Sequence, residues 1–245
     1  GLFGGYSNVQ LFNLGKSVGA IYLAKAGTKA TDKTAIQFSS TSNSTTWSKA
    51  KQVNGTTSAL NNLRVQIDNG KDDSLLAFID KGENDDYSFI RILKKSATGT
   101  WTTQAKGSKV SITDTDVMGA RVALNNKGEM LVAAVTDDGD SYLSIHLMAY
   151  DVKGKQKGDE QVPVTGAPLT GMALQAFYSD DGQVNLMYDI LGETPLDIEE
   201  EMTFATTINW LQGNMTDGLG DPMVIGSQEN LGAVMSASVD VTQYN

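Results

Sequence analysis

The chain has 245 residues, of which 40% are hydrophobic and 20% are charged, a composition typical of a folded globular protein and too apolar for a disordered one. Acidic residues outnumber basic ones by 29 to 19, so the formal net charge is −10 and the chain lacks the basic surface of a general nucleic-acid binder. It has no cysteine and one histidine, which excludes disulfides, zinc–thiolate sites and sites with several histidines. No apolar run approaches the roughly 20 residues of a membrane-spanning helix.

Four segments of the chain share one pattern, in which an alternating strand leads through a polar turn into a more apolar strand. The turns contain glycines spaced 55, 58 and 54 residues apart, and these are Gly15, Gly70, Gly128 and Gly182. Glycine supplies the positive φ angle that tight hairpins need. A repeat of this length that contains several short strands is typical of a β-propeller blade.

The first unit, at about 5–53, contains the strand pair NVQLFNLGKSVGAIYLAKAG, a third strand TAIQFSS and a fourth strand KAKQV. The second unit, at about 61–111, contains LRVQIDNGKDDSLLAFIDKG, then YSFIRILKK and KGSKVSI. The runs VGAIYL and LLAFI are continuously apolar, which indicates strands buried on both faces, whereas RVQID alternates as a half-buried strand does. Trp47 and Trp101 lie 54 residues apart, near the end of the third strand of each unit.

The third unit, at about 119–165, contains ARVALNNKGEMLVAAVTDDG, YLSIHLMAYD and EQVPV, and the fourth, at about 171–226, contains LQAFYSDDGQVNLMYDILGE, EMTFATTINW and PMVIG. The segment LGAVMSASVDVTQYN then matches the first strand of a fifth unit, so we expect one more strand at 231–241. No amphipathic run of 12 or more residues carries helix caps, which predicts very little helix.

The sequence therefore predicts one all-β domain over residues 1–245, a β-propeller of four-stranded antiparallel blades with four full units and one extra strand. Two forms of the ring stay open: a compact ring closed by the terminal strand, or part of a larger propeller. A two-sheet β-sandwich is the alternative fold, since repeated hairpins also pair in that way.

The run ARVALNNKGEMLVAAV resembles the repeats of bacterial surface propellers. The segment SSTSNSTTW, at 39–47, resembles the Asp-box hairpin S-x-D-x-G-x-x-W of sialidase-like propellers, with Ser42 in place of Asp and Ser44 in place of Gly. The resemblance implies a propeller fold far more than an activity.

Acidic residues concentrate in the four connections between second and third strands, which we expect at 25–34, 80–87, 136–142 and 189–201. These 38 residues hold 14 of the 29 acids. Because every blade repeats the same connection, we expect these loops on one face, with a negative field over the third and fourth units that attracts cations or basic partners. The candidate binding residues are Asp137, Asp138, Asp140, Glu193, Asp197, Glu199, Glu200 and Glu201. A solvated surface that keeps the protein in solution is the competing interpretation.

Two features of these loops suggest specific contacts. Asp137, Asp138 and Asp140 lie within four residues and could supply oxygen ligands to calcium, although a tight turn with capping aspartates explains DDGD equally well. Calcium is the one cofactor that we consider. The insertion LGETPLDIEEEM is longer than its counterparts and places apolar groups at its tip, which makes it the candidate partner-contact loop.

Enzymatic candidates carry less support. Arg64, Arg91 and Arg121 match a sialidase arginine clamp in number, but Arg91 lies on a third strand and no Tyr–Glu nucleophile pair is evident. A glycosidase needs two carboxylates, and the acids closest to an apolar strand, Asp68 and Asp189, are both expected at strand ends. We expect His146 to be packed or hydrogen-bonded, without a catalytic role. No residue is assigned to catalysis.

The predicted function is a non-catalytic binding module that recognises a glycan or a protein. The alternatives are a propeller-type glycoside-active enzyme and a structural or assembly subunit. A composition rich in Ser, Thr, Asn and Gly is frequent in bacterial exported proteins, so we expect a periplasmic, cell-surface or secreted location.

Overall fold

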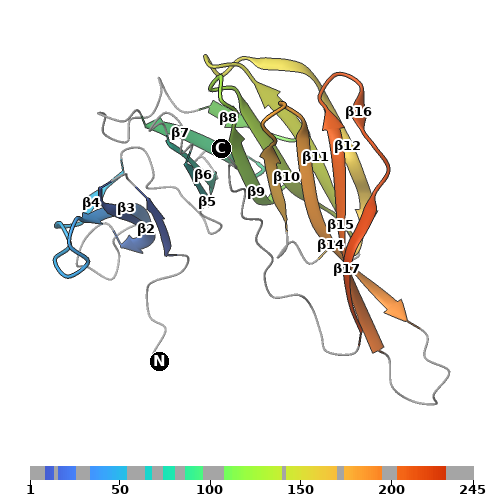
Figure 1. Ribbon diagram of the computed structural model, residues 1–245, viewed down its shortest axis with the longest axis horizontal. Coiled ribbons are helices and arrows are strands. Elements are labelled where there is room, and N and C mark those ends of the chain that lie inside the picture. The colour runs from blue at the N-terminus through green and yellow to red at the C-terminus, as the bar shows by residue number, and fades with distance from the viewer. Residues whose placement is uncertain are drawn as a thin grey trace.

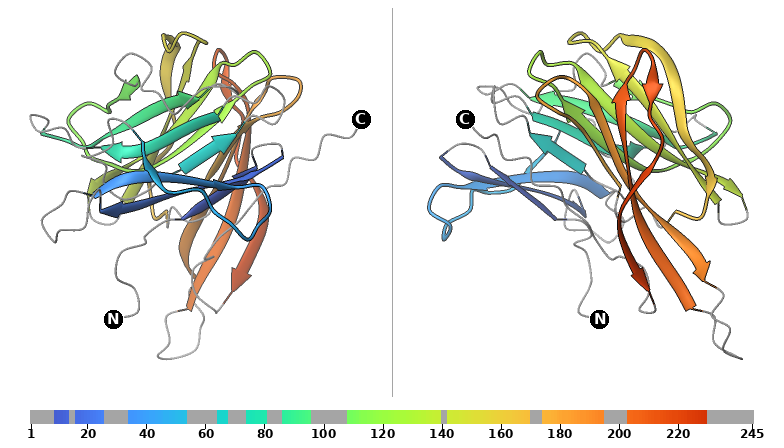
Figure 2. Two further views of the ribbon diagram at one scale, coloured as in Figure 1. Left: turned by 90° about the vertical axis from the view of Figure 1, so that its left-hand side faces the viewer. Right: turned by 45° about the vertical axis from the view of Figure 1, so that its right-hand side comes forward.

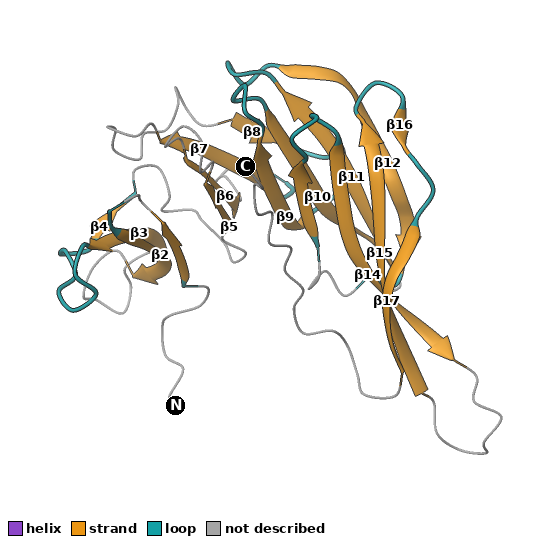
Figure 3. Cartoon of the chain, viewed as in Figure 1, coloured by secondary structure: helices purple, strands orange, loops and turns teal. Residues whose placement is uncertain are grey.

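The computed structural model describes residues 9–13, 16–25, 34–53, 64–67, 74–80, 86–95, 108–139, 142–169, 174–194 and 203–229. Within these ranges the chain forms strands β1 to β17 and no helix (Figure 3). The strands make four antiparallel sheets, each built from one continuous part of the chain, and we number the sheets as blades one to four (Figure 1).

Each blade is a meander in which sequence neighbours pair. Blade one contains β1 (Gln10–Asn13), β2 (Val18–Lys25), β3 (Thr34–Thr41) and β4 (Lys51–Gln52). Blade two contains β5 (Arg64–Ile67), β6 (Ser74–Asp80), β7 (Phe89–Lys95) and β8 (Ser108–Val110).

Blade three contains β9 (Val117–Leu124), β10 (Met130–Gly139), β11 (Tyr142–Tyr150) and β12 (Gln156–Ala167). Blade four contains β13 (Gln175–Tyr178), β14 (Val184–Thr194), β15 (Thr203–Asn214), β16 (Gly218–Leu219) and β17 (Met223–Glu229). Both β16 and β17 pair with β15, so they share the position of the fourth strand.

The blades are arranged around a common axis because their first strands, β1, β5, β9 and β13, contact one another in this order. Blades one and four therefore stand at a steep angle to each other in the views of Figure 2. The fold is a β-propeller: the strands form four successive sheets, and the alternative of two facing sheets is wrong.

A hydrophobic layer fills each of the three spaces between successive blades. Phe12, Ile36 and Phe78 belong to the layer between blades one and two. Ile90 and Val132 belong to the layer between blades two and three. The layer between blades three and four contains Leu131, Leu147, Leu174, Leu186 and Leu211, among others. The second strands of blades two and three, β6 and β10, contribute to two layers each, one on either face, which explains their continuous apolar runs.

The predicted turn glycines at 128 and 182 adopt the backbone that the hairpins need. Gly128 and Gly182 have φ angles of 78° and 83°. In both turns the glycine amide donates to the carbonyl oxygen three residues earlier, Asn125 in blade three and Ser179 in blade four, at 2.9 and 2.8 Å. The same turn therefore occurs at the same place in the two blades.

Two predicted connections start later than the acidic residues suggested. β14 continues to Thr194, which pairs with Thr203, so the predicted loop at 189–201 begins as a long hairpin arm. β10 continues to Gly139, so Asp137 and Asp138 lie at a strand end. Asp137 and Asp138 are exposed at the end of β10, whereas Asp189 is fully buried inside β14. The predicted strand at 231–241 lies outside the described residues.

No helix in the described part of the chain is long and apolar enough to cross a membrane.

Candidate functional site

A cleft of about 430 Å³ lies where the turns of blades three and four meet. It is bounded by the β9–β10 and β13–β14 turns, the start of β12, and the turn after β15. Its lining combines carboxylates, amides, lysines and two tyrosines: Asn125, Asn126, Lys127, Glu129, Tyr150, Lys157, Tyr178, Asp180, Asp181, Met215 and Thr216 are among the lining residues. A concave surface with aromatic side chains and a few polar groups is the usual form of a small-ligand site.

The wall from blade three is held by a hydrogen-bonded turn. The Asn125 side-chain oxygen accepts from the amides of Lys127 and Glu129, at 3.0 and 2.9 Å, and its Nδ2 donates to Glu129 Oε2 at 2.8 Å. Lys157 Nζ donates to Glu129 Oε1 at 2.5 Å. The hydrogen bonds from Lys157 and Asn125 hold the pKa of Glu129 below its usual range, so this carboxylate is ionised at neutral pH.

The wall from blade four is also a hydrogen-bonded turn, and its acidic acceptor is Asp181. Asp181 Oδ1 accepts from Ser179 Oγ at 2.6 Å and from the Gln183 amide at 3.2 Å. These bonds, with that from Ser179 first, lower the pKa of Asp181. Asp180, one residue earlier at the tip of the turn, is exposed and lines the cleft.

Two tyrosines form the aromatic part of the lining. Burial, and then the nearby charge of Glu160, raises the pKa of Tyr150 to about 12. Burial, and then the charge of Glu129, raises the pKa of Tyr178 to about 12. Both hydroxyls therefore stay protonated at neutral pH. Tyr150 points its hydroxyl at Met148 Sδ, 3.8 Å away, inside blade three.

The two blades that form the cleft are joined beneath and beside it. The hydrophobic layer between blades three and four includes Val184 and, partly buried at its edge, Tyr178 and Met215. Gln161 Nε2 of β12 donates to the main-chain oxygen of Asn214, 3.3 Å away, which links the outer parts of the two blades directly.

Three groups at the cleft remain for a ligand. Within the described residues, no hydrogen bond or ion pair involves the carboxylate of Asp180, the ammonium group of Lys127 or the hydroxyl of Tyr178. The other charged lining groups, Glu129, Lys157 and Asp181, are already hydrogen-bonded within the protein. A ligand with several hydroxyl groups would satisfy a free carboxylate and a free phenol and would lie against the half-buried Tyr178 ring.

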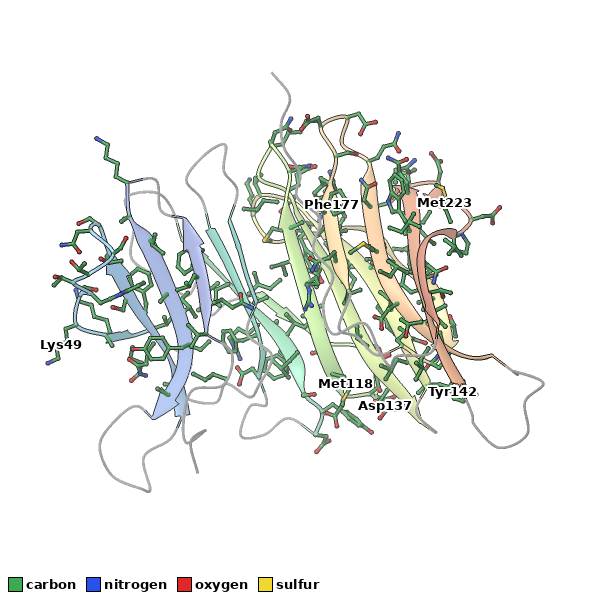
Figure 4. All side chains as sticks on the ribbon, turned by 60° about the horizontal axis from the view of Figure 1, so that its bottom comes forward. Lys49, Met118, Asp137, Tyr142, Phe177 and Met223 are labelled. Carbon is green, nitrogen blue, oxygen red and sulfur yellow. The ribbon has the colours of Figure 1, made fainter. Side chains whose placement is uncertain are left out.

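The acids predicted from the sequence lie at the other end of blade three. Asp137 and Asp138 lie at the end of β10 that is remote from the β9–β10 turn, and Figure 4 shows Asp137 beside Met118 and Tyr142 at this end. Asp137 Oδ1 accepts from the Gly139 amide at 2.8 Å. Glu193 lies in β14, opposite Phe204. The other predicted binding residues, Asp140, Asp197, Glu199, Glu200 and Glu201, lie outside the described residues.

Asp138 acts as a structural acceptor. Its Oδ2 accepts from Ser144 Oγ and, at 3.2 Å, from the Gly166 amide, while Oδ1 lies 3.4 Å from Thr136 Oγ1. In the part of the chain that the structure describes, no group of three or more metal-binding side chains comes together. The proposed calcium site therefore still depends on Asp140, which that part does not include.

His146 is hydrogen-bonded on both sides, as predicted. Its Nδ1 lies 2.5 Å from Glu160 Oε1, and its Nε2 lies 3.0 Å from Thr136 Oγ1. This acid–histidine–hydroxyl order is that of a catalytic triad, but the Thr136 residue is only 1% exposed. A nucleophile must reach its substrate, so the arrangement serves packing of the sheet.

Two carboxylates, Asp189 and Asp80, are fully buried in strands, whereas the sequence predicted a strand end for Asp189 and a loop for Asp80. Asp189 lies inside β14 and is fully buried, so the prediction of a strand-end position is wrong. Asp80, also fully buried, accepts from Arg91 Nε at 2.6 Å, and Arg91 lies over the Phe89 ring at 5.1 Å. Arg91 is therefore held by Asp80 and Phe89 within blade two, which accounts for one of the three arginines.

The first strands, nearest the axis, contain no acidic residue over the ranges of β1, β5, β9 and β13. Arg64 of β5 and Arg121 of β9 occupy matching positions there, opposite Ala77 and Ala133. Within these described ranges, the first strands therefore offer no pair of carboxylates.

Sequence reasoning missed the cleft. The available signal was the match between the NNKGE and SDDGQ turns at 125–129 and 179–183, which a propeller places side by side on neighbouring blades.

Comparisons with known proteins bear on the fold. No protein-family model matches the chain, and no curated protein sequence matches it. A thermostable family-43 glycoside hydrolase of known structure is similar with a TM-score of 0.52 and 13% identity, over 90% of this chain and 72% of that protein. An exo-β-1,3-galactanase from Phanerochaete chrysosporium, solved with galactose, has a TM-score of 0.50 and 13% identity, over 89% of this chain and 49% of that one. This chain thus spans about half the length of the galactanase, and the likeness shows a common fold.

Proposed function

We propose that the protein is a glycoside-active β-propeller that binds a carbohydrate in the cleft between blades three and four. The observation that carries the proposal is the cleft itself, where tyrosine rings lie beside ionised carboxylates and free hydrogen-bonding groups. The two proteins of similar fold named above are glycoside hydrolases by description, which supports a carbohydrate ligand over a protein ligand.

Sugar recognition would use the groups that the fold leaves available. The Tyr178 ring is half-buried and offers an apolar face to the C–H face of a sugar. The Asp180 carboxylate accepts from two sugar hydroxyls at once, and the Tyr178 hydroxyl donates or accepts one further bond. The charge-assisted bonds to Asp180 are the strong ones, each worth about 1.5–3 kcal/mol.

Hydrolysis requires two carboxylates about 5–10 Å apart, one ionised and one protonated. Glu129 and Asp181 have lowered pKa values, so each suits the ionised role of base or nucleophile. The proton donor must be another group, and the described lining residues do not assign one.

The same pKa values favour a second candidate, carbohydrate binding without turnover. Both carboxylates with perturbed pKa values are shifted toward the ionised form and are tied to turn amides or to Lys157. A site built for binding needs no proton donor. Export to the cell surface would suit either function and stays a prediction from composition.

A glycan array followed by hydrolysis assays on the bound glycans tests both candidates. We expect binding that Asp180→Asn weakens about tenfold or more, with product release lost in Asp180→Asn or Asp181→Asn if the protein is an enzyme. Asp221→Asn, an exposed change in blade four outside the cleft lining, is the matched control. Binding that survives all cleft variants would overturn the assignment of the site, and binding without product release would select the second candidate.

A further inference from the structure

The charges around the cleft do not cancel. Three carboxylates, Glu129, Asp180 and Asp181, face two lysines, Lys127 and Lys157. Lys157 is committed to Glu129 at 2.5 Å, which leaves two acids against the exposed Lys127. The whole chain adds to this local excess, because its formal net charge is −10.

We infer that the cleft selects neutral glycans over glycans that carry carboxylate or sulfate groups, and that Asp180 is the residue that sets this selection. The inference rests on the proposed function, since it names the class of carbohydrate that the same site accepts.

Asp180 has this role because it is the one lining carboxylate that the fold does not use. Asp181 Oδ1 accepts from Ser179 Oγ and the Gln183 amide, and both oxygens of Glu129 accept from side chains. Asp180 makes no hydrogen bond or ion pair within the described residues. An ionised carboxylate only accepts hydrogen bonds, so it pairs with sugar hydroxyls and repels a second carboxylate at the same place.

The remaining groups cannot reverse this preference. Tyr178 is a neutral donor, because burial raises its pKa to about 12. Lys127 is exposed at the turn, where solvent and salt screen its attraction for an acidic ligand. An acidic sugar placed against Tyr178 would therefore meet more negative than positive charge.

Pairs of oligosaccharides that differ only in oxidation at C6 give a direct test. We would measure the affinities of galactan and galacturonan, glucan and glucuronan, and mannan and mannuronan oligomers, with the same length, linkage and anomeric configuration within each pair, by titration calorimetry. The neutral member of a bound pair should bind about tenfold more tightly at low salt, since one like-charge contact of ordinary strength corresponds to about that factor.

Two variants and a salt series identify the origin of the difference. Asp180→Asn should reduce the neutral-to-acidic ratio to about threefold or less, whereas Lys127→Gln should increase it, and 0.5 M salt should reduce it in the wild-type protein. A ratio that Asp180→Asn leaves unchanged would overturn the role of Asp180. Tighter binding of the acidic members would overturn the inference while the proposed carbohydrate function stands. No binding to these oligomers or to the array would overturn the proposed function itself.

Discussion

Lys157 and Glu129 form an ion pair, with Nζ 2.5 Å from Oε1, that joins the start of β12 to the turn between β9 and β10. The pair links the last strand of blade three to the turn between its first two strands, on the side where the cleft opens. It fixes one wall of the cleft, and the charge of Glu129 balances the positive charge of Lys157. The pair therefore has a consequence for stability and another for the electrostatics of the site.

The stability of the protein should fall in acid in part through Glu129. Its pKa is lowered in the folded state, so its contribution is present above its unfolded pKa, near 4.5, and is lost as the pH falls through the lower folded value. Glu129→Gln should reduce the free energy of unfolding at pH 7 by up to about 1 kcal/mol, because the pair is partly exposed. Urea unfolding at pH 7 and pH 3 measures this, and the difference should shrink at pH 3. A difference independent of pH would contradict the prediction, and Asp159→Asn, an exposed change on β12, is the control.

Alkaline conditions should also weaken the fold, through Tyr150 and Tyr178. Their pKa values are raised to about 12 against an ordinary value of 10, because burial disfavours the phenolate. Between these values the unfolded state releases protons that the folded state keeps, so stability falls as the pH rises from 10 to 12. Absorbance of ionised tyrosine at alkaline pH, recorded with circular dichroism, measures both effects. Tyr178→Phe should lessen the loss, and ionisation of all eight tyrosines near pH 10 with the fold intact would contradict the prediction.

Replacing Ser44 with glycine should stabilise the protein. Its φ angle is 63°, in the left-handed region where a side chain costs about 1 kcal/mol, and it stands where the Asp-box pattern has glycine. Asn43 Oδ1 accepts from the amides of Thr45 and Thr46, at 3.1 and 2.9 Å, so the turn is fixed around this residue. Ser44→Gly should raise the free energy of unfolding by about 0.5 kcal/mol after the greater freedom of glycine in the unfolded chain is subtracted. Thermal unfolding measures it, and Ser42→Gly, the neighbouring control, should be neutral or destabilising.

The fold was predictable because each blade repeats the same local pattern of apolar strands joined by a polar turn with glycine. Gly128 and Gly182 each close a hairpin with a positive φ angle, and the apolar runs before and after them are buried between blades. Strand ends were less predictable. An acidic residue normally indicates a loop, yet Asp189 lies inside β14 and is fully buried. A sequence pattern does not show that the fold can bury a carboxylate at that position.

The cleft was harder to predict because it is formed between blades. Glu129 and Asp181 each look like ordinary turn residues in the sequence, and Lys157 follows a different turn. The repeat pattern places the two turns on neighbouring blades, but it does not show that Tyr178 and Lys157 join them to line one cleft. Clusters of acids along the chain, such as Asp137 and Asp138, are easy to find, and these two accept hydrogen bonds within their own blade.

Asp138 and Asp137 should differ sharply in their effect on stability although they are neighbours and both exposed. Asp138 accepts from the Gly166 amide near the end of β12 and from Ser144, which is 3% exposed, so its removal leaves a nearly buried hydroxyl without its acceptor. Asp138→Ala should therefore cost about 1–3 kcal/mol, whereas Asp137→Ala removes one bond to the exposed Gly139 amide and should cost less than about 1 kcal/mol. Urea unfolding of both variants measures the difference, with Ser144→Ala in the Asp138→Ala background to test whether the two losses overlap, as they should for partners.

Each titration is repeated with millimolar calcium and with chelator. If hydrogen bonds carry the effect, the cost of Asp138→Ala is the same in both, whereas a calcium-dependent gain in the wild-type protein that both variants lose would show that these aspartates hold a metal ion instead.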